Sequence, residues 1–200
     1  MSRAVTVDVF AEDQAHEAWL RPAIIRMARE ISVRVQVQVR SARGGHGRVT
    51  QELELYQRAI TSRLTVSMPD LVVVAIDSNC TPFADVQKDI RKSLRPEIGD
   101  SAVLATPEPH IERWFLADLQ AFHQVVGTTP SVPSRRCERG FYKQILSRAV
   151  TNAGHPSTLG GIEFAEELVE AFDFYRAGRT VPSLRRFLQD LRTQLQQRKI

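Results

Sequence analysis

Acidic and amide side chains follow three predicted strands at the points where the strands end. They are Glu12 after Val5 to Phe10, Asp77 and Asn79 after Leu71 to Ile76, and Glu112 after Ala102 to Ala105. Carboxyl ends of parallel strands share one edge of a sheet, so we expect these side chains to converge. Oxygen ligands of this kind suit Mg²⁺ or Mn²⁺, and such an ion polarises a phosphodiester and positions a water molecule. The pattern predicts metal-dependent phosphoryl transfer.

Each of these acids also has a simpler interpretation. Glu12 fits a solvated loop, and Glu112 fits the first turn of a helix, where the dipole favours a negative charge. Glu12 would alternatively act as a general base if the neighbouring acids raised its pKa. Asp77 is harder to explain structurally, because Thr81 and Pro82 already offer an N-cap and a first helical residue for the helix that follows.

The elements that must position these residues alternate between strand and helix. The apolar and alternating segments predict strands at Val5 to Phe10, Arg34 to Arg40, Leu71 to Ile76 and Ala102 to Ala105, and helices at His16 to Ile31, Thr50 to Leu64, Phe83 to Leu94 and Thr106 to Gly127. This order favours an α/β fold with a mainly parallel four-stranded sheet flanked by helices. Arg34 to Arg40 alternates strictly and is expected near an edge, and Pro22 predicts a kink or a later helix start.

The last third of the chain has only helical patterns. Residues 128–138 contain several Pro, Ser and Thr residues and predict a linker or loop. Helices are predicted at Gly140 to Val150, Ile162 to Tyr175 and Leu184 to Gln197. We therefore expect an α/β domain over 1–127 and a C-terminal all-helical extension over 139–200.

The positive charge is concentrated in the C-terminal part. Residues 1–126 have 15 Lys and Arg against 16 Asp and Glu, and residues 127–200 have 12 against 7. This excess suits a phosphate-rich partner or, equally, solvated helix faces. The loop Ser41 to Arg48 is rich in glycine but lacks the spacing of a P-loop. Arg43, His46, Arg48 and the later Lys143 are candidate nucleic-acid contacts.

Cysteine content and hydropathy point to an intracellular protein. Cys80 and Cys137 are too few for a disulfide framework or a thiolate metal site, and we expect two free thiols. No apolar run approaches the roughly 20 residues of a membrane span, and the first residues follow a strand pattern rather than a signal peptide. A cytoplasmic location is expected.

Several motifs together resemble a known family. Glu12 after the first strand and VVVAID-x-N at Val72 to Asn79 are similar to the Toprim domain, which has a glutamate and a later Asp-x-Asp at these places. IERWFLADLQAF at Ile111 to Phe122 and PSLRRFLQDL at Pro182 to Leu191 resemble an uncharacterised bacterial Toprim-like family. That family is related to the nuclease domain of the OLD (overcoming lysogenization defect) proteins.

The resemblance implies a Mg²⁺- or Mn²⁺-dependent nuclease acting on DNA or RNA, with Glu12 and Asp77 as the catalytic pair. Asn79 and Glu112 would complete the metal ligands, and Asp13 and Asp118 would support them. It also implies an AAA or ABC-type ATPase partner in phage defence. In this chain Asp13 replaces the glycine that usually follows the glutamate, and Asn79 replaces the second aspartate.

Two further hypotheses remain open. The loss of a charge at Asn79 should weaken metal binding, which favours a catalytically inactive module that binds and regulates an ATPase. A phosphoacceptor receiver domain using Asp77 is the third hypothesis. It lacks a lysine after the late strand, where the chain has Thr106 and Pro107, and the helical tail is foreign to it. The oligomeric state is left open.

Overall fold

The fold is built around a parallel β-sheet. The computed structural model describes residues 3–41, 45–62, 67–134 and 136–199. These residues form a four-stranded sheet in the order β2-β1-β3-β4, with every neighbouring pair parallel. The strands are β1 (Val5–Ala11), β2 (Val35–Ser41), β3 (Leu71–Ala75) and β4 (Ala102–Ala105). The predicted α/β class is confirmed, and β2 lies at an edge.

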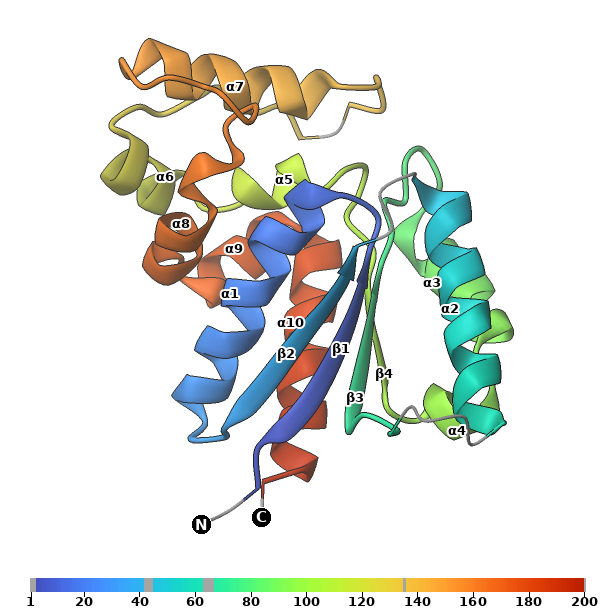
Figure 1. Cartoon of the computed structure of the whole chain (residues 1–200). Coiled ribbons are helices and arrows are strands. Elements are labelled where there is room, and N and C mark those ends of the chain that lie inside the picture. The colour runs from blue at the N-terminus through green and yellow to red at the C-terminus, as the bar shows by residue number, and fades with distance from the viewer. Residues whose placement is uncertain (1–2, 42–44, 63–66, 135, 200) are drawn as a thin grey trace.

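Helices cover both faces of this sheet. They are α1 (Gln14–Glu30), α2 (His46–Thr61), α3 (Phe83–Ser93), α4 (Pro96–Gly99), α5 (Glu112–Phe115), α6 (Leu119–Val126), α7 (Phe141–Asn152), the 3-10 turn η1 (Ile162–Phe164), α8 (Ala165–Ala171), α9 (Phe174–Thr180) and α10 (Pro182–Gln197). Figure 1 shows α2, α3 and α4 on one side of the sheet and α1 and α10 on the other. Helix α7 lies beyond the carboxyl ends of the strands.

Two apolar cores hold the layers together. Because strand side chains alternate between faces, Val7 and Val73 join the larger core under α1 and α10, whereas Phe10 and Val74 join the smaller core under α2 and α3. All five residues of β3 are buried. The apolar run of β3 therefore follows from burial on both faces of a central strand.

The C-terminal helices share the larger core with the sheet. Phe187 of α10 packs beside Trp114 of α5, with ring centroids 5.3 Å apart, and Trp114 packs on Trp19 of α1 at 5.1 Å. Leu168 of α8 and Leu191 of α10 belong to the same core. The division at residue 127 stays a prediction from composition, and the helices after it complete the layer that α1 begins.

Three local predictions were wrong, and one alternative is excluded. The predicted helix from His16 is present as α1, which begins at Gln14 with Asp13 as its cap, so the alternative start near Pro22 is excluded. Thr81 does not cap α3, whose N-cap residue is Pro82. The expected helix from Thr106 is instead a loop with a cis Glu108–Pro109 bond, followed by the separate helices α5 and α6. The segment Ile162 to Tyr175 divides into η1, α8 and the start of α9.

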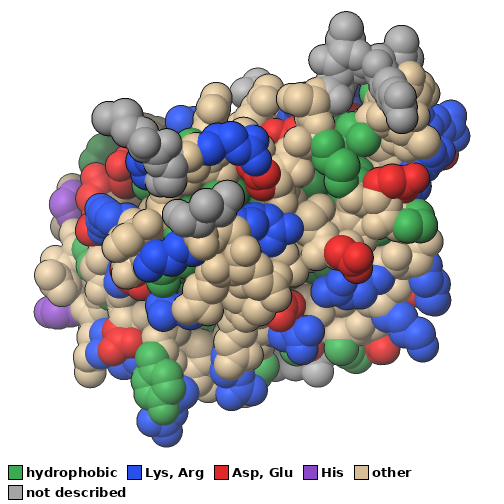
Figure 2. All heavy atoms as spheres, turned by 90° about the horizontal axis from the view of Figure 1, so that it is seen from below, with side chains coloured by type: hydrophobic (Ala, Val, Ile, Leu, Met, Phe, Trp, Pro, Cys, Tyr) green, Lys and Arg blue, Asp and Glu red, His purple; other side chains and the backbone are tan. Residues whose placement is uncertain are grey.

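The surface at the amino ends of the strands is mixed in charge. Figure 2 views this end of the molecule, where Lys and Arg side chains alternate with Asp and Glu and hydrophobic patches are small. Across the described ranges, no helix combines the length and the apolar character that crossing a membrane requires.

Candidate metal centre

At the carboxyl edge of the sheet, the direction of the chain connections reverses between β1 and β3. From β1 the chain crosses to β2 on one side, and β3 then pairs with β1 on the other side. Ligands of open parallel sheets bind outside the strand ends where the connections reverse direction in this way. Glu12 directly follows β1, and Asp77 lies two residues after the end of β3. The topology therefore places both side chains at the favoured position.

Glu12, His16 and Asp77 form the cluster with metal-ligand geometry. One carboxylate oxygen of each acid and one ring nitrogen of His16 all lie within 4.8 Å of one another. The Nε2 atom of His16 is 3.1 Å from Oδ1 of Asp77. The backbone N–H of Asp77 donates to Oε2 of Glu12 at 2.9 Å, which holds the two strand ends in register.

His16 is the residue that the sequence interpretation missed. It lies in the first turn of α1, and its side chain is fully buried. Its Nδ1 is 2.8 Å from Oδ1 of Asp13, and this same oxygen accepts from the backbone N–H groups of Ala15 and His16. A carboxylate on the far ring nitrogen is the partner that usually orients a metal-binding histidine. The available signal was spacing, since His16 is one helical turn beyond Glu12.

Two buried atoms of this cluster have only each other as a partner. Among the described residues, Nε2 of His16 and Oδ1 of Asp77 lie 3.1 Å apart, which allows an ion pair when His16 is protonated and leaves both atoms without a partner when it is not. Buried polar atoms without partners are rare in folded proteins. Two ligand atoms bound at right angles to one ion at about 2.1 Å lie about 3.0 Å apart. The observed separation therefore fits neighbouring ligands of one divalent ion.

The charges of the cluster are strongly coupled. Burial opposes a charge on His16, but Asp77 and Asp13 outweigh it and raise the pKa of the imidazole to about 10. Burial likewise opposes ionisation of Asp13, yet the hydrogen bonds from His16 lower its pKa to about 2. Burial and the charge of Asp77 raise the pKa of Glu12, despite the opposing hydrogen bond from the Asp77 backbone. Without a metal, His16 is an imidazolium between two carboxylates.

Glu112 lies beside this cluster rather than within it. It is the first residue of α5 and is half-buried. Burial raises the pKa of its carboxyl group, and the charges of Asp77 and Asp13 raise it further. Glu112 is not among the three residues with metal-ligand geometry. Its position suits proton transfer at the edge of the site.

Asn79 is held within the loop after β3 by hydrogen bonds to the backbone. Its backbone has a left-handed φ of 52°, and its exposed side-chain amide donates to the carbonyl oxygen of Asp77 at 3.4 Å. Its backbone N–H donates to the carbonyl oxygen of Pro109 at 2.9 Å. Asn79 therefore shapes the loop after β3, and its place in the expected ligand set stays a prediction.

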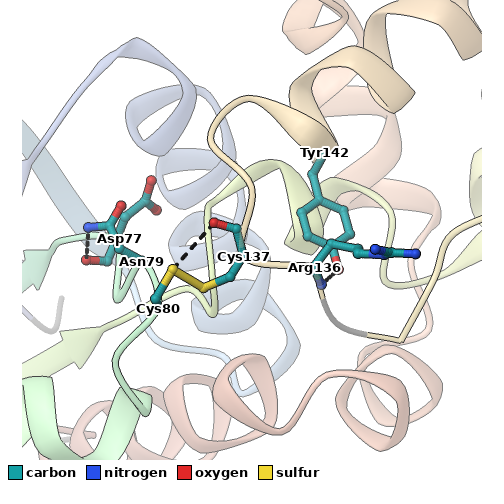
Figure 3. The surroundings of a disulfide bond; sticks show 6 residues. All are labelled: Asp77, Asn79, Cys80, Arg136, Cys137 and Tyr142. Atoms are coloured by element: carbon teal, nitrogen blue, oxygen red, sulfur yellow. Dashed lines mark hydrogen bonds between the residues drawn. A yellow bond between two sulfur atoms is a disulfide. The ribbon is translucent and has the colours of Figure 1, made fainter.

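The loop that carries Asp77 is tied by a disulfide. Cys80 and Cys137 are bonded, with Cα atoms 5.4 Å apart and a sequence separation of 57. The prediction of two free thiols was wrong, because the fold brings the segment before α7 onto the loop after β3. Figure 3 shows the bond close to Asp77 and Asn79. On the same segment, the Arg136 backbone N–H donates to the Tyr142 hydroxyl at 3.0 Å.

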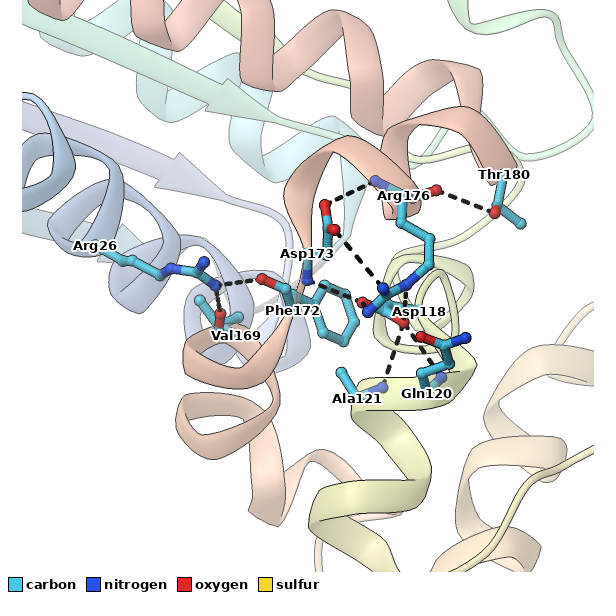
Figure 4. A network of polar contacts seen from close by, with 9 residues as sticks. All are labelled: Arg26, Asp118, Gln120, Ala121, Val169, Phe172, Asp173, Arg176 and Thr180. Carbon is cyan, nitrogen blue, oxygen red and sulfur yellow. Dashed lines mark hydrogen bonds and ion pairs between the residues drawn. The ribbon is translucent and has the colours of Figure 1, made fainter.

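Asp118 has a structural role away from the metal cluster. Its buried carboxylate caps α6 and accepts from Nε and Nη2 of Arg176 at 2.9 and 2.7 Å. The backbone N–H of Asp173 donates to it at 2.9 Å. Figure 4 shows this network joining α6 to α9. The expected support of the metal site by Asp118 is therefore replaced by a contact between helices.

Two of the four expected nucleic-acid contacts have described side chains. Arg48 is an exposed residue of α2, 3.4 Å from Glu52, and Lys143 is an exposed residue of α7. Arg43 and the side chain of His46 lie outside the described residues. Gly45 precedes α2, and a Cβ there would be 3.9 Å from Oε1 of Glu12. The positive end of α2 thus adjoins the cluster, which favours an anion at this place.

Comparison with known proteins does not add to this geometry. The chain matches no protein-family model, no curated protein and no solved structure. The resemblance to Toprim-like proteins therefore stays a prediction from short motifs. The function has to be argued from the site itself.

Proposed function

We propose that this protein is a divalent-metal-dependent phosphodiesterase that cleaves nucleic acid. The observation that carries the proposal is the cluster of Glu12, His16 and Asp77 at the reversal point of a parallel sheet, in which Nε2 of His16 and Oδ1 of Asp77 are buried with no partner but each other. The adjoining amino end of α2 supplies a favourable position for a phosphate group. The arrangement is suited to holding a metal and an anionic substrate together.

Each residue has a distinct role in this proposal. Glu12, Asp77 and Nε2 of His16 would hold the ion, which would supply polarisation of the phosphodiester and activation of water. Asp13 keeps the His16 ring oriented by accepting from Nδ1–H. The backbone N–H of Asp77 fixes Glu12 so that its other oxygen faces the site. Asp13 and the Asp77 backbone therefore position the ligands.

Glu112 is the proposed proton-transfer residue. A carboxyl group with a raised pKa exchanges a proton more readily near neutral pH than an ordinary glutamate does. Burial and the acids of the cluster raise the pKa of Glu112 in this way. It would accept a proton from the attacking water or donate one to the leaving oxygen.

The metal is Mg²⁺ or Mn²⁺, and the ligand set favours Mn²⁺. Mg²⁺ strongly prefers oxygen ligands, whereas an imidazole nitrogen suits transition metals better. A site with two carboxylates and one imidazole would therefore bind Mn²⁺ more tightly than Mg²⁺.

The biological setting follows from the resemblance alone. We propose that the enzyme is an effector of bacterial phage defence that acts with an AAA or ABC-type ATPase in the cytoplasm. Thiols in that compartment are usually kept reduced. The Cys80–Cys137 bond of the structure would be reduced there. Alkylation of free thiols during lysis therefore tests the location, since two labelled cysteines would support the cytoplasm and an unlabelled pair would contradict it.

The test of the enzymatic proposal is cleavage of supercoiled plasmid and tRNA with Mn²⁺ or Mg²⁺. The variants Glu12→Gln, His16→Asn and Asp77→Asn are expected to lose at least about 100-fold in rate, because each removes a ligand. The matched control is Glu97→Gln, an exposed acid of α4 outside the cluster. Equal rates for all five proteins would refute the proposal.

A second candidate is a module without catalytic activity that regulates an ATPase. Its support is the contact of the His16 imidazolium with both Asp13 and Asp77, because the positive charge of His16 partly neutralises the two carboxylates without a metal. Absence of Mn²⁺ binding at millimolar metal, in a folded protein, would favour this candidate over the enzyme.

A further inference from the structure

A hollow that is separate from the metal centre lies where α1, α9 and α10 meet. Its volume is about 700 Å³, within the usual range for ligand pockets. Met27 and Leu188 form part of its apolar floor, and Arg179, Arg185 and Arg192 line it with positive charge. Figure 1 shows the three helices on the same side of the sheet. We call this hollow the arginine groove.

The charge of the arginine groove is only partly neutralised. Arg192 pairs with Glu30 at 3.3 Å. Within the described residues, no carboxylate is paired with Arg179 or Arg185, and no acidic residue lines the groove. Two unpaired guanidinium groups beside an apolar floor provide a binding position for an anion that also has an apolar part.

Tyr175 gives the arginine groove an aromatic wall. Its side chain is unusually exposed for a large aromatic residue, at 77%. Tyr175 and Arg179 also line a second hollow of about 440 Å³, together with Asp173, whose charge is paired with Arg176. The ring therefore stands between two adjoining hollows. This arrangement suits an extended chain with repeated flat groups and negative charges better than a single compact ligand.

The neighbouring Arg176 is not available to a ligand in the same way. Its guanidinium is held by the buried carboxylate of Asp118 and by Asp173. Figure 4 shows Arg176 turned into this network. Arg26 is likewise engaged, since it donates to the carbonyl oxygen of Phe172 and lies over the ring of Phe174 at 4.3 Å. The available charge is therefore that of Arg179 and Arg185.

We propose that the arginine groove binds single-stranded nucleic acid, with a base stacked on Tyr175 and phosphates on Arg179 and Arg185. Base stacking on aromatic rings combined with a basic groove is the general chemistry of single-strand binding. The groove lies along the same helix as the proposed metal centre. Met27 of the groove follows His16 on α1 by about three helical turns, or roughly 16 Å. This inference rests on the proposed function for its biological meaning, because it defines the substrate as single-stranded.

The test is fluorescence anisotropy with a labelled oligothymidylate of about twelve nucleotides, in EDTA so that no cleavage occurs. Arg179→Gln with Arg185→Gln is expected to weaken binding at least tenfold and to lower the salt dependence by about two counterions. Tyr175→Ala is expected to weaken it about tenfold. The control pair, Lys88→Gln with Arg91→Gln on the exposed surface of α3, should bind as wild type does.

Three outcomes would overturn the proposal. The first is unchanged binding by the double variant, and the second is equally tight binding of a blunt duplex. The third is equally tight binding of polyglutamate with the same loss in the variants, which would indicate an acidic protein partner. Asp77→Asn separates this inference from the enzymatic proposal, since it should keep oligonucleotide binding. Groove-dependent binding without cleavage by wild type would refute only the nuclease.

Discussion

At the scale of single residues, His16 decides what the cluster can do. Its two ring nitrogens face different carboxylates, Asp13 at 2.8 Å and Asp77 at 3.1 Å. With a proton on each nitrogen it neutralises the acids as an imidazolium. In the proposed site, with Nε2 free, it would be a metal ligand oriented by Asp13. Proton and metal therefore compete for one nitrogen atom.

This competition predicts a pH-dependent metal affinity. Because Asp77 and Asp13 raise the pKa of His16 to about 10, metal must displace a proton at neutral pH. The affinity for Mn²⁺ should therefore rise with pH, by up to about tenfold per unit between about pH 6 and 8. Titration calorimetry in buffers of different ionisation enthalpy measures both the affinity and the released proton.

The matched variants for this titration are His16→Asn and His123→Asn, the second an exposed residue of α6. His16→Asn should bind Mn²⁺ weakly and with little dependence on pH. His123→Asn should behave as wild type does. A steep pH dependence that survives in His16→Asn would assign the displaced proton to another group, and His16 would no longer be a ligand.

At the scale of elements, the loop after β3 is held from two sides. The backbone N–H groups of Ser78 and Asn79 donate to carbonyl oxygens of Pro107 and Pro109 at 2.8 and 2.9 Å. The Cys80–Cys137 disulfide then joins this loop to the segment before α7. These contacts fix the position of Asp77 relative to Glu12.

The disulfide is expected to stabilise the fold. It closes a loop of 57 residues. In the chain-entropy model, loss of this constraint on the unfolded chain lowers the free energy of unfolding by about 4 kcal/mol. Cys137→Ser should therefore lower the free energy of unfolding in urea by up to this amount. Wild type in reductant should match the variant. No effect of reductant on wild type would show that the bond does not form in solution.

At the scale of the whole molecule, the last third of the chain is part of the main core. Phe187 and Leu191 of α10 are fully buried with Trp19 and Trp114. The candidate metal centre depends on this packing, because α1, which carries His16, is held by contacts with α8 and α10. Removal of the C-terminal helices would expose one face of the sheet layer.

A chain of residues 1–127 is therefore expected not to fold alone. Loss of the covering helices leaves large apolar side chains in water, which favours a loosely packed or aggregated state. Near-ultraviolet circular dichroism and urea unfolding, compared with the full chain, provide the measurement. A fragment with a sharp unfolding transition and a native aromatic spectrum would instead support an independent domain ending at residue 127.

Local patterns were sufficient to predict the class of fold. Two local patterns predicted a central and an edge strand: the apolar run Leu71 to Ala75 and the alternation of Val35, Val37 and Val39. A strand buried on both faces has a continuous apolar run, whereas a strand buried on one face has an apolar residue at every second position. The same patterns placed Glu12 and Asp77 at strand ends. Helix boundaries near Pro22, Thr81 and Thr106 were less predictable, since capping depends on which side chain reaches the backbone.

The sequence by itself determined the alternating elements, the parallel sheet and two of the three residues in the metal cluster. Only the tertiary structure decided that His16 completes the cluster, that Asp118 binds Arg176, and that Cys80 meets Cys137. The physical reason is that strand periodicity is a local property. Contacts between side chains far apart in the chain depend on how helices pack over the sheet, which no local pattern records.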